Sequence, residues 1–361
     1  MFRKLSACLI LVVIPAVAAA SLDDIQLPPG FVIEEYADVP NARSLALGEQ
    51  GTLFVSNRKG RSVYAVVEQK DGSTRTIELL SGLKTPNGIA FHDGDLFVAE
   101  IGRVIRYADI ENNLEDAPDG QVLDIELPSD RHHGWRYIGF GPDDHLYISI
   151  GAPCNICDEF GYAQIIRVNI DGTGRETYAS GIRNSVGFTW HPTTGELWFT
   201  DNGRDMLGDD LPACELNRAP RQGLHFGYPY CHAGEISDPK FGAGRDCANF
   251  TPPVQKLGPH VAPLGVKFYT GDNFPEQYHN QVFIAEHGSW NRSKKIGYRI
   301  MLVRLEGNRA VSYEPFAQGW LQNERVSGRP VDLIVLEDGS MLVSDDYSGK
   351  IYRIRFAGNK K

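Results

Sequence analysis

The chain has 361 residues, of which 42% are hydrophobic and 23% charged, and its formal net charge is −10. This composition is ordinary for a globular protein, and the acidic balance argues against nucleic acid and anionic lipid as partners, because both select basic proteins. The 38 glycines and the 10% aromatic content favour many short strands joined by tight turns.

The N-terminus has the pattern of a signal peptide. A short basic start, "MFRK", precedes an apolar run that ends in three alanines before Ser21. The run is too short to span a membrane comfortably. We therefore interpret residues 1–20 as a signal peptide and residues 21–361 as one exported domain, periplasmic or secreted, without stable membrane insertion.

An internal repeat organises the rest of the chain. Apolar alternation, a Gly or Asp turn and a second apolar-aromatic run recur six times, at Arg43, Asn87, Arg136, Val186, Leu264 and Val331. Hairpins about 40–50 residues apart are typical of propeller blades. We predict an all-β, six-bladed β-propeller; the alternative is a β-sandwich in which the spacing is a coincidence.

Cysteine-containing segments interrupt this period. Residues 204–258 carry three cysteines and no clear strand pattern, so we predict a long ordered insertion between blades, closed by a Cys231–Cys247 disulfide. For Cys154 and Cys157 we favour a local disulfide, although a redox role stays open. Cys214 is the candidate for the unpaired thiol.

Polar residues precede the first strand of several repeats, and in a propeller such positions converge on the mouth of the central channel. His133 could act there as a general base, or could simply donate to a backbone carbonyl. Arg183, Arg292 and Arg329 would give a positive lining suited to an anionic ligand, although Arg183 could equally form an ion pair between blades. The acidic turn after Thr200 offers oxygens of the kind calcium prefers, or is a solvated loop.

Several stretches carry a resemblance to a known family: "RHHGWRYIGFGPDDHLYISIGAPCNICD", "GIRNSVGFTWHPTTGELWFTDNGRD", "APLGVKFYTG", "FIAEHGSWNR" and "GRPVDLIVLEDGSMLVSDD". They resemble the glucose/sorbosone dehydrogenase family, the soluble sugar dehydrogenases that use pyrroloquinoline quinone (PQQ) and calcium. The resemblance runs from about Leu27 to Phe356, and the L-sorbosone dehydrogenase-like branch is the most similar.

The resemblance implies a role for each matching residue. His133 matches the catalytic base that takes a proton from the sugar while hydride moves to the quinone. Arg183 would stabilise the charge on the quinone oxygen, with Asn184 and Asn202 beside the cofactor. Gly203 and Arg204 match the backbone carbonyls that hold calcium. The remaining cofactor contacts are assigned to Arg329, to His260 in place of a threonine, and to His287, Arg292 or Lys294 in place of a lysine.

The resemblance thus implies a PQQ-dependent oxidoreductase acting on an aldose or related sugar aldehyde. Because the chain has no haem-attachment motif, electrons would pass to a separate acceptor, a cytochrome or a quinone. Two other functions stay open. A calcium-dependent lactonase would place several carboxylates on the propeller axis, and a non-catalytic binding propeller would leave His133 outside the channel.

Overall fold

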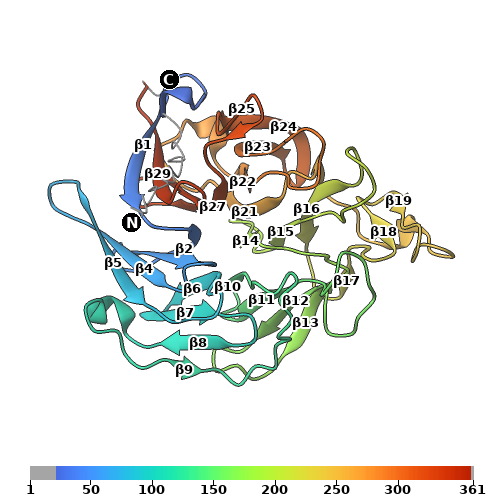
Figure 1. Ribbon diagram of the computed structural model, residues 1–361, viewed down its shortest axis with the longest axis horizontal. Coiled ribbons are helices and arrows are strands. Elements are labelled where there is room, and N and C mark those ends of the chain that lie inside the picture. The colour runs from blue at the N-terminus through green and yellow to red at the C-terminus, as the bar shows by residue number, and fades with distance from the viewer. Residues whose placement is uncertain (1–21, 359–361) are drawn as a thin grey trace, which may run out of the picture.

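The computed structural model describes residues 22–358, so the predicted signal peptide lies outside the described residues. Six sheets, each of four or five strands and antiparallel except for one parallel edge pairing, are arranged as blades around a central axis (Figure 1). The innermost strands of the blades surround the middle of the ring. The predicted all-β, six-bladed propeller is therefore confirmed.

Each predicted repeat forms the first two strands of one blade. The first blade comprises β2 (Ala42–Leu47), β3 (Leu53–Asn57), β4 (Val63–Glu68) and β5 (Thr74–Leu80). The second comprises β6 (Gly88–His92), β7 (Asp95–Ala99), β8 (Val104–Tyr107) and β9 (Gln121–Val122). The third comprises β10 (Ile138–Phe140), β11 (Leu146–Ile150), β12 (Gln164–Val168), β13 (Glu176–Ser180) and the parallel edge strand β17 (Leu224–His225).

The other three blades complete the ring. The fourth comprises β14 (Phe188–Trp190), β15 (Leu197–Asp201), β16 (Ala213–Ala219) and β20 (Gln255–Pro259). The fifth comprises β21 (Pro263–Phe268), β22 (Val282–Glu286), β23 (Arg299–Glu306) and β24 (Arg309–Gln318). The sixth comprises β27 (Pro330–Val335), β28 (Met341–Asp345), β29 (Lys350–Phe356) and β1 (Phe31–Asp38). Four single-turn 3-10 helices occur in the described chain: η1 (Leu22–Asp24), η2 (Ile110–Asn113), η3 (Cys247–Asn249) and η4 (Glu276–Tyr278).

The second strand of every blade is buried along its whole length, as in β3, β7 and β28. Neighbouring blades cover both of its faces, so these strands are apolar runs instead of alternating patterns. Their carboxyl ends carry buried polar residues, including Asn57, Asp201 and Asp345.

Ring closure joins the two ends of the described chain. β1, at the N-terminal end, pairs antiparallel with β29, so the sixth blade contains strands from both ends (Figure 1). Phe31 also packs edge-on against Phe274, Phe316 and Phe356. The closure therefore combines main-chain hydrogen bonds with aromatic packing between the fifth and sixth blades.

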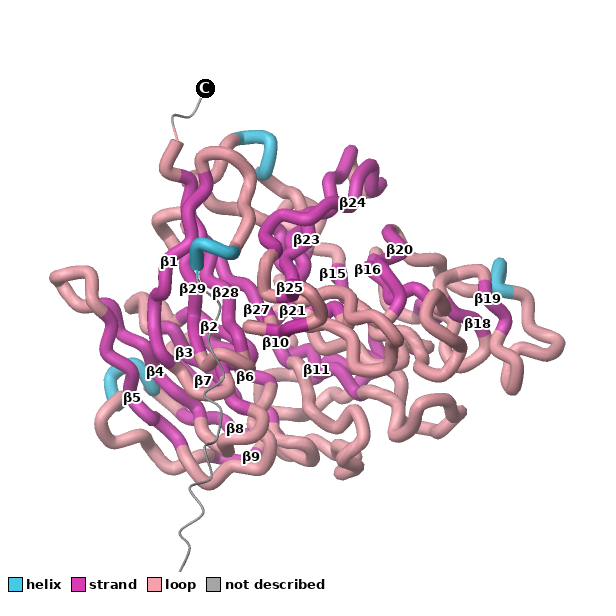
Figure 2. Tube along the Cα trace, turned by 45° about the horizontal axis from the view of Figure 1, so that its top comes forward, coloured by secondary structure: helices cyan, strands magenta, loops and turns pink. Residues whose placement is uncertain are grey.

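The segment 204–258 contains more regular structure than we predicted. β16 and β20 pair within it and supply the third and fourth strands of the fourth blade. The irregular part is therefore the stretch between them, which carries the small hairpin of β18 (Cys231–His232) and β19 (Ile236–Ser237) at the outer edge of the ring (Figure 2). β16 was missed because "ACELNRA" mixes polar and apolar residues without the turn signals of the other blades.

Both predicted disulfides, Cys154–Cys157 and Cys231–Cys247, are present, and Cys214 is a buried free thiol. A second small hairpin joins β25 (Leu321–Gln322) and β26 (Arg325–Val326). Within residues 22–358, no helix combines the length and apolar character needed to cross a membrane.

Candidate active site

A cavity of about 680 Å³ lies at the centre of the ring. Eight of the predicted site residues line it: His133, Arg183, Asn184, Asn202, Gly203, His260, His287 and Arg329. They come from connections that precede or follow strands of the third to sixth blades. The structure therefore brings together residues that are almost 200 positions apart in the sequence.

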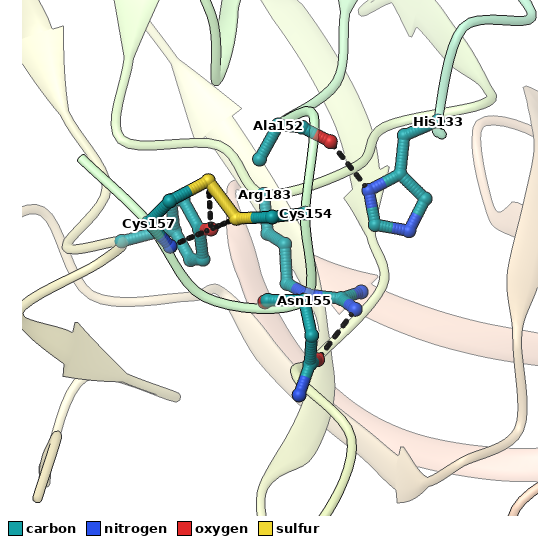
Figure 3. Close-up of a disulfide and its surroundings, with 7 residues drawn as sticks. His133, Ala152, Cys154, Asn155, Cys157 and Arg183 are labelled. Atoms are coloured by element: carbon teal, nitrogen blue, oxygen red, sulfur yellow. Dashed lines mark hydrogen bonds between the residues drawn. A yellow bond between two sulfur atoms is a disulfide. The ribbon is translucent and has the colours of Figure 1, made fainter. Parts of the chain in front are cut away.

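His133 is held in one orientation. Its backbone has φ of 48°, and its Nδ1 lies 2.9 Å from the carbonyl oxygen of Ala152 (Figure 3). A carbonyl can only accept, so Nδ1 carries the proton and Nε2 is left as an acceptor. Burial, Arg183 and His132 lower the pKa of His133 to about 2, so the ring is neutral at physiological pH.

Gly151 makes room for this arrangement. A Cβ at position 151 would lie 2.6 Å from the Cβ of His133 and 3.0 Å from the Oδ1 of Asn184. A side chain there would have to displace one of these two residues. The absence of a side chain at position 151 is therefore a condition for the close approach of His133 and Asn184.

Arg183 is almost fully buried and makes a set of directed contacts. Its Nε and Nη2 donate to the main-chain oxygen and Oδ1 of Asn155, each at 2.9 Å (Figure 3). Nη2 also contacts Asp205 at 3.1 Å. Asn155 lies inside the Cys154–Cys157 loop, whose Cys157 amide donates to the hydroxyl of Tyr228 at 3.0 Å. The disulfide loop thus positions the partner of the arginine.

Carboxylates at the ends of second strands hold the basic residues at the blade entrances. Asp201 accepts the main-chain amides of Arg183 and Asn184 at 2.8 and 2.7 Å, and Asp345 accepts the amide of Arg329 at 2.9 Å. Burial and the Glu215 carboxyl, opposite on β16, raise the pKa of Asp201 to about 8. The propeller repeat thus fixes the backbone of Arg183 and of Arg329.

Three arginines of the lining were missed by the sequence analysis: Arg43, Arg58 and Arg131. Arg43 pairs with Asp346 at 2.9 Å, and the same carboxylate contacts Nε2 of His287 at 2.9 Å. Arg58 lies 4.6 Å from the ring centroid of Trp135, and burial together with Arg43 lowers its pKa to about 10. Arg43 starts the first repeat, so its register was a usable signal; Arg58 carried none.

The cavity is strongly electropositive. Five arginines line it against one carboxylate, that of Asp205. The Nε of Arg329 is buried and has no hydrogen-bond partner among the described residues, while its guanidinium lies over the Tyr347 ring. A buried, unpaired donor of this kind is costly unless a ligand accepts from it. An anion with several acceptor oxygens fits this lining.

Three of the predicted residues have side chains outside the lining. The Arg204 side chain pairs with Asp238, whereas the calcium prediction concerns its main-chain oxygen. Arg292 donates to the carbonyl of Asp209 and to Asp210, and it is also outside the lining, as is the exposed Lys294. Arg43, Arg58 and Arg131, not Arg292, therefore complete the positive wall around Arg183 and Arg329.

The side-chain donors that the lining offers to a metal ion include one carboxylate, that of Asp205. Within residues 22–358, no three His, Cys, Asp or Glu side chains lie close enough to share a metal ion. Gly203 lines the cavity, and its neighbour Asn202 is tied to Asn184 through its Nδ2 at 2.9 Å. The oxygens of Asn202, Gly203 and Asp205 are donors of the kind that calcium accepts.

Known proteins share this architecture. The sequence pattern of one family, described as TrAA12-like, matches residues 25–357. An uncharacterised protein of Borreliella burgdorferi is 31% identical over 98% of this chain and 97% of its own length. The "Pyrroloquinoline quinone-dependent pyranose dehydrogenase" of Coprinopsis cinerea is 33% identical over 48% of this chain, and the match spans 30% of that longer protein.

A solved structure agrees with this result. The "Calcium structure of Trichoderma reesei Carbohydrate-Active Enzymes Family AA12" superposes with a TM-score of 0.82 at 20% identity, covering 95% of this chain and 98% of that one. At this identity, the superposition shows the common fold. Together with the family match, it confirms the resemblance to the soluble sugar dehydrogenases.

Proposed function

Since the chain belongs to the TrAA12-like family, we propose that it is a PQQ-dependent oxidoreductase that oxidises an aldose or related sugar aldehyde. The observation that carries the proposal is the central cavity, in which a neutral, oriented histidine faces a wall of arginines. PQQ bound in this cavity would supply the quinone that accepts the two electrons lost by the sugar. An external acceptor, a cytochrome or a quinone, would then receive them.

His133 is assigned the role of general base. Its Nδ1 proton is committed to the carbonyl of Ala152, so Nε2 is the atom that takes the proton of the sugar hydroxyl. Burial, Arg183 and His132 lower the pKa of His133 in the protein without a cofactor. An anionic cofactor would offset the charge of Arg183 and raise the pKa of His133 toward the range useful for catalysis.

The arginines are assigned to the cofactor. PQQ is a tricarboxylate, and Arg329 has a buried donor without a partner. Arg183 is oriented by Asn155 and would stabilise negative charge that develops on a quinone oxygen. Asn184, Asn202, His260 and His287 complete the proposed contacts around the cofactor.

Calcium is proposed as the second cofactor, with the main-chain oxygens of Gly203 and Arg204 as protein ligands. The AA12 structure of Trichoderma reesei described as a calcium structure supports this assignment. The two disulfides support an oxidising, exported location for the enzyme.

The two other functions have less support. A lactonase of the propeller type would need several carboxylates on the axis, and the lining holds one, Asp205. A binding propeller that catalyses no reaction does not require an oriented histidine in the cavity. His133 is oriented by the Ala152 carbonyl and by close packing against Gly151, which leaves its Nε2 free to accept a proton.

The test is reconstitution. Purified protein is incubated with PQQ and calcium, and sugar-dependent dye reduction is followed for wild type and His133→Ala. We expect turnover by wild type and a loss of kcat of about 10²-fold or more in the variant, the scale of a lost general base. No PQQ binding and no turnover with any aldose would overturn the proposal, and an unchanged kcat in His133→Ala would overturn the role of the base.

A further inference from the structure

A second hollow, which we call the basic groove, opens beside the central cavity. It has a volume of about 810 Å³ and shares Arg58, Arg131 and Trp135 with the cavity lining. Its other lining residues come from connections of the first three blades: Lys59, Arg61, Leu83, Lys84, Thr85, Glu100, Ile101, Gly102, Arg103 and Ser129. The shared residues make the groove a continuation of the cavity.

The charge of the groove is opposite to that of the protein. Six cationic side chains line it, against one carboxylate, in a chain with a formal net charge of −10. That carboxylate, Glu100, is buried and already engaged by Arg103 and by the amide of Lys84. Within residues 22–358, the side chains of Lys59, Lys84 and Arg131 have no hydrogen bond or ion pair to protein groups. The positive charge is therefore available to a ligand.

Lys84 occupies a position that the fold uses for ligand-facing cations. Its amide donates to Glu100, which directly follows the second strand of its blade. Arg183 and Arg329 are held in the same way by Asp201 and Asp345. The repeat thus places a third cation at a blade entrance, but this one faces the groove instead of the cavity.

Trp135 supplies an apolar surface at the junction. Its ring lines both the cavity and the groove, and the Arg58 guanidinium lies 4.6 Å from the centroid of this ring. An aromatic face beside cationic donors suits a sugar ring that bears a carboxylate, because the C–H face of the ring packs on the indole while the carboxylate pairs with the cations.

We propose that the basic groove is an extended subsite for an acidic oligosaccharide. The sugar at the reducing end enters the central cavity for oxidation, and the following uronate units lie in the groove against Arg61, Lys84 and Arg131. This inference rests on the proposed sugar oxidation. A concave groove that continues into the cavity fits an extended small ligand, whereas protein partners dock on larger and flatter surfaces.

The probe pair is trigalacturonate and its fully methyl-esterified form, which match in length and differ in charge. With the PQQ-loaded enzyme, we expect kcat/KM to be at least tenfold higher for the acid, through a lower KM, and the ratio to fall as salt is raised. In Lys84→Gln, the acid-to-ester ratio should drop about tenfold. The matched control Lys240→Gln removes an exposed lysine that lines neither space and should keep the wild-type ratio.

Calorimetry separates this inference from the proposed function. Titration of trigalacturonate into wild type and Lys84→Gln reports binding whether or not sugar is oxidised. Equal affinity of both proteins, or equal affinity of acid and ester for wild type, would overturn the subsite. So would a Lys84→Gln variant that slows reduction of an acidic protein acceptor while trigalacturonate binding is unchanged. If trigalacturonate binds but no sugar is oxidised, the proposed oxidation is wrong and the subsite is still supported.

Discussion

Arg183 and Asn155 form a double hydrogen bond, in which Nε donates to the Asn155 carbonyl and Nη2 donates to its Oδ1, each at 2.9 Å (Figure 3). Asn155 Oδ1 also accepts the amide of Asp205 at 2.8 Å. Because Asn155 lies between the two half-cystines of the Cys154–Cys157 disulfide, a covalent loop controls the orientation of a buried cation in the cavity.

The first prediction concerns this pair. Asn155→Ala removes the side-chain acceptor, so the Arg183 guanidinium loses one of its fixed partners and is held less tightly, although the main-chain oxygen of residue 155 and Asp205 remain in contact with it. We expect kcat to fall on the order of 10- to 10²-fold with a smaller change in KM, since misplacing a group that acts on developing charge weakens mainly the transition state. Stopped-flow and steady-state dye reduction measure both constants.

Asn155→Asp is the matched control, because it keeps an acceptor at this place and should recover much of the lost kcat. Cys154→Ser with Cys157→Ser should behave like Asn155→Ala if the loop is what holds Asn155. An unchanged kcat in the alanine variant would mean that Arg183 does not depend on this contact.

The second prediction concerns the protonation of His133. Its pKa is lowered to about 2 in the folded protein, so the ring should stay neutral to below pH 4.5 in the cofactor-free protein. NMR of labelled imidazole nitrogens measures this directly. The unfolded chain protonates near pH 6.5 while the folded chain does not, so acid should weaken folding below that pH, and His133→Gln should reduce this sensitivity. A His133 signal that titrates near pH 6 would contradict the prediction.

The third prediction concerns the space beside His133. Gly151→Ala would bring a methyl group to 2.6 Å from the His133 Cβ, so we expect loss of most activity in a protein that still folds. Gly139→Ala serves as the control, because its Cβ meets the Phe188 and Trp190 rings at 3.2–3.4 Å, outside the cavity lining. If both variants lose activity only in proportion to folded protein, Gly151 has no special role at the site.

The fourth prediction concerns the buried carboxyl pair. Asp201 has a raised pKa of about 8, so the folded protein holds a proton that the unfolded chain releases near pH 4. Stability should therefore decline as pH rises from about 4 to about 8. Glu215→Gln removes the neighbouring carboxyl and should flatten this decline. Asn217 Nδ2 now donates to the Glu215 carboxyl, so the Asn217 amide must turn over for its Oδ1, unpaired among the described residues, to accept from the new amide.

Urea denaturation at intervals from pH 5 to pH 9 measures the effect. Glu235→Gln is the control, since that carboxylate is exposed and pairs with Lys256. Parallel pH profiles for wild type and Glu215→Gln would show that the two carboxyls do not share a proton.

Some features were predictable because they are local and periodic. The six hairpins follow from apolar alternation and turn residues, and the second strands are apolar along their length because both faces are covered. The repeat register also identified Arg183, Asn184 and Arg329 as residues of the channel mouth. The blade strand β16 was missed because two of its buried residues, Glu215 and Asn217, are polar and break the apolar pattern expected of a buried strand.

The sequence by itself determined the blade count, the two disulfides and the positions where cations enter the channel, because each depends on short-range pattern or on a repeat. Only the tertiary structure decided which arginines share a wall. It placed Arg43 and Arg58 in the cavity and turned Arg292 toward Asp210, because ring closure and loop packing set the direction of each side chain. It also gave Lys84, an ordinary loop residue in the sequence, a place in a groove that continues the cavity.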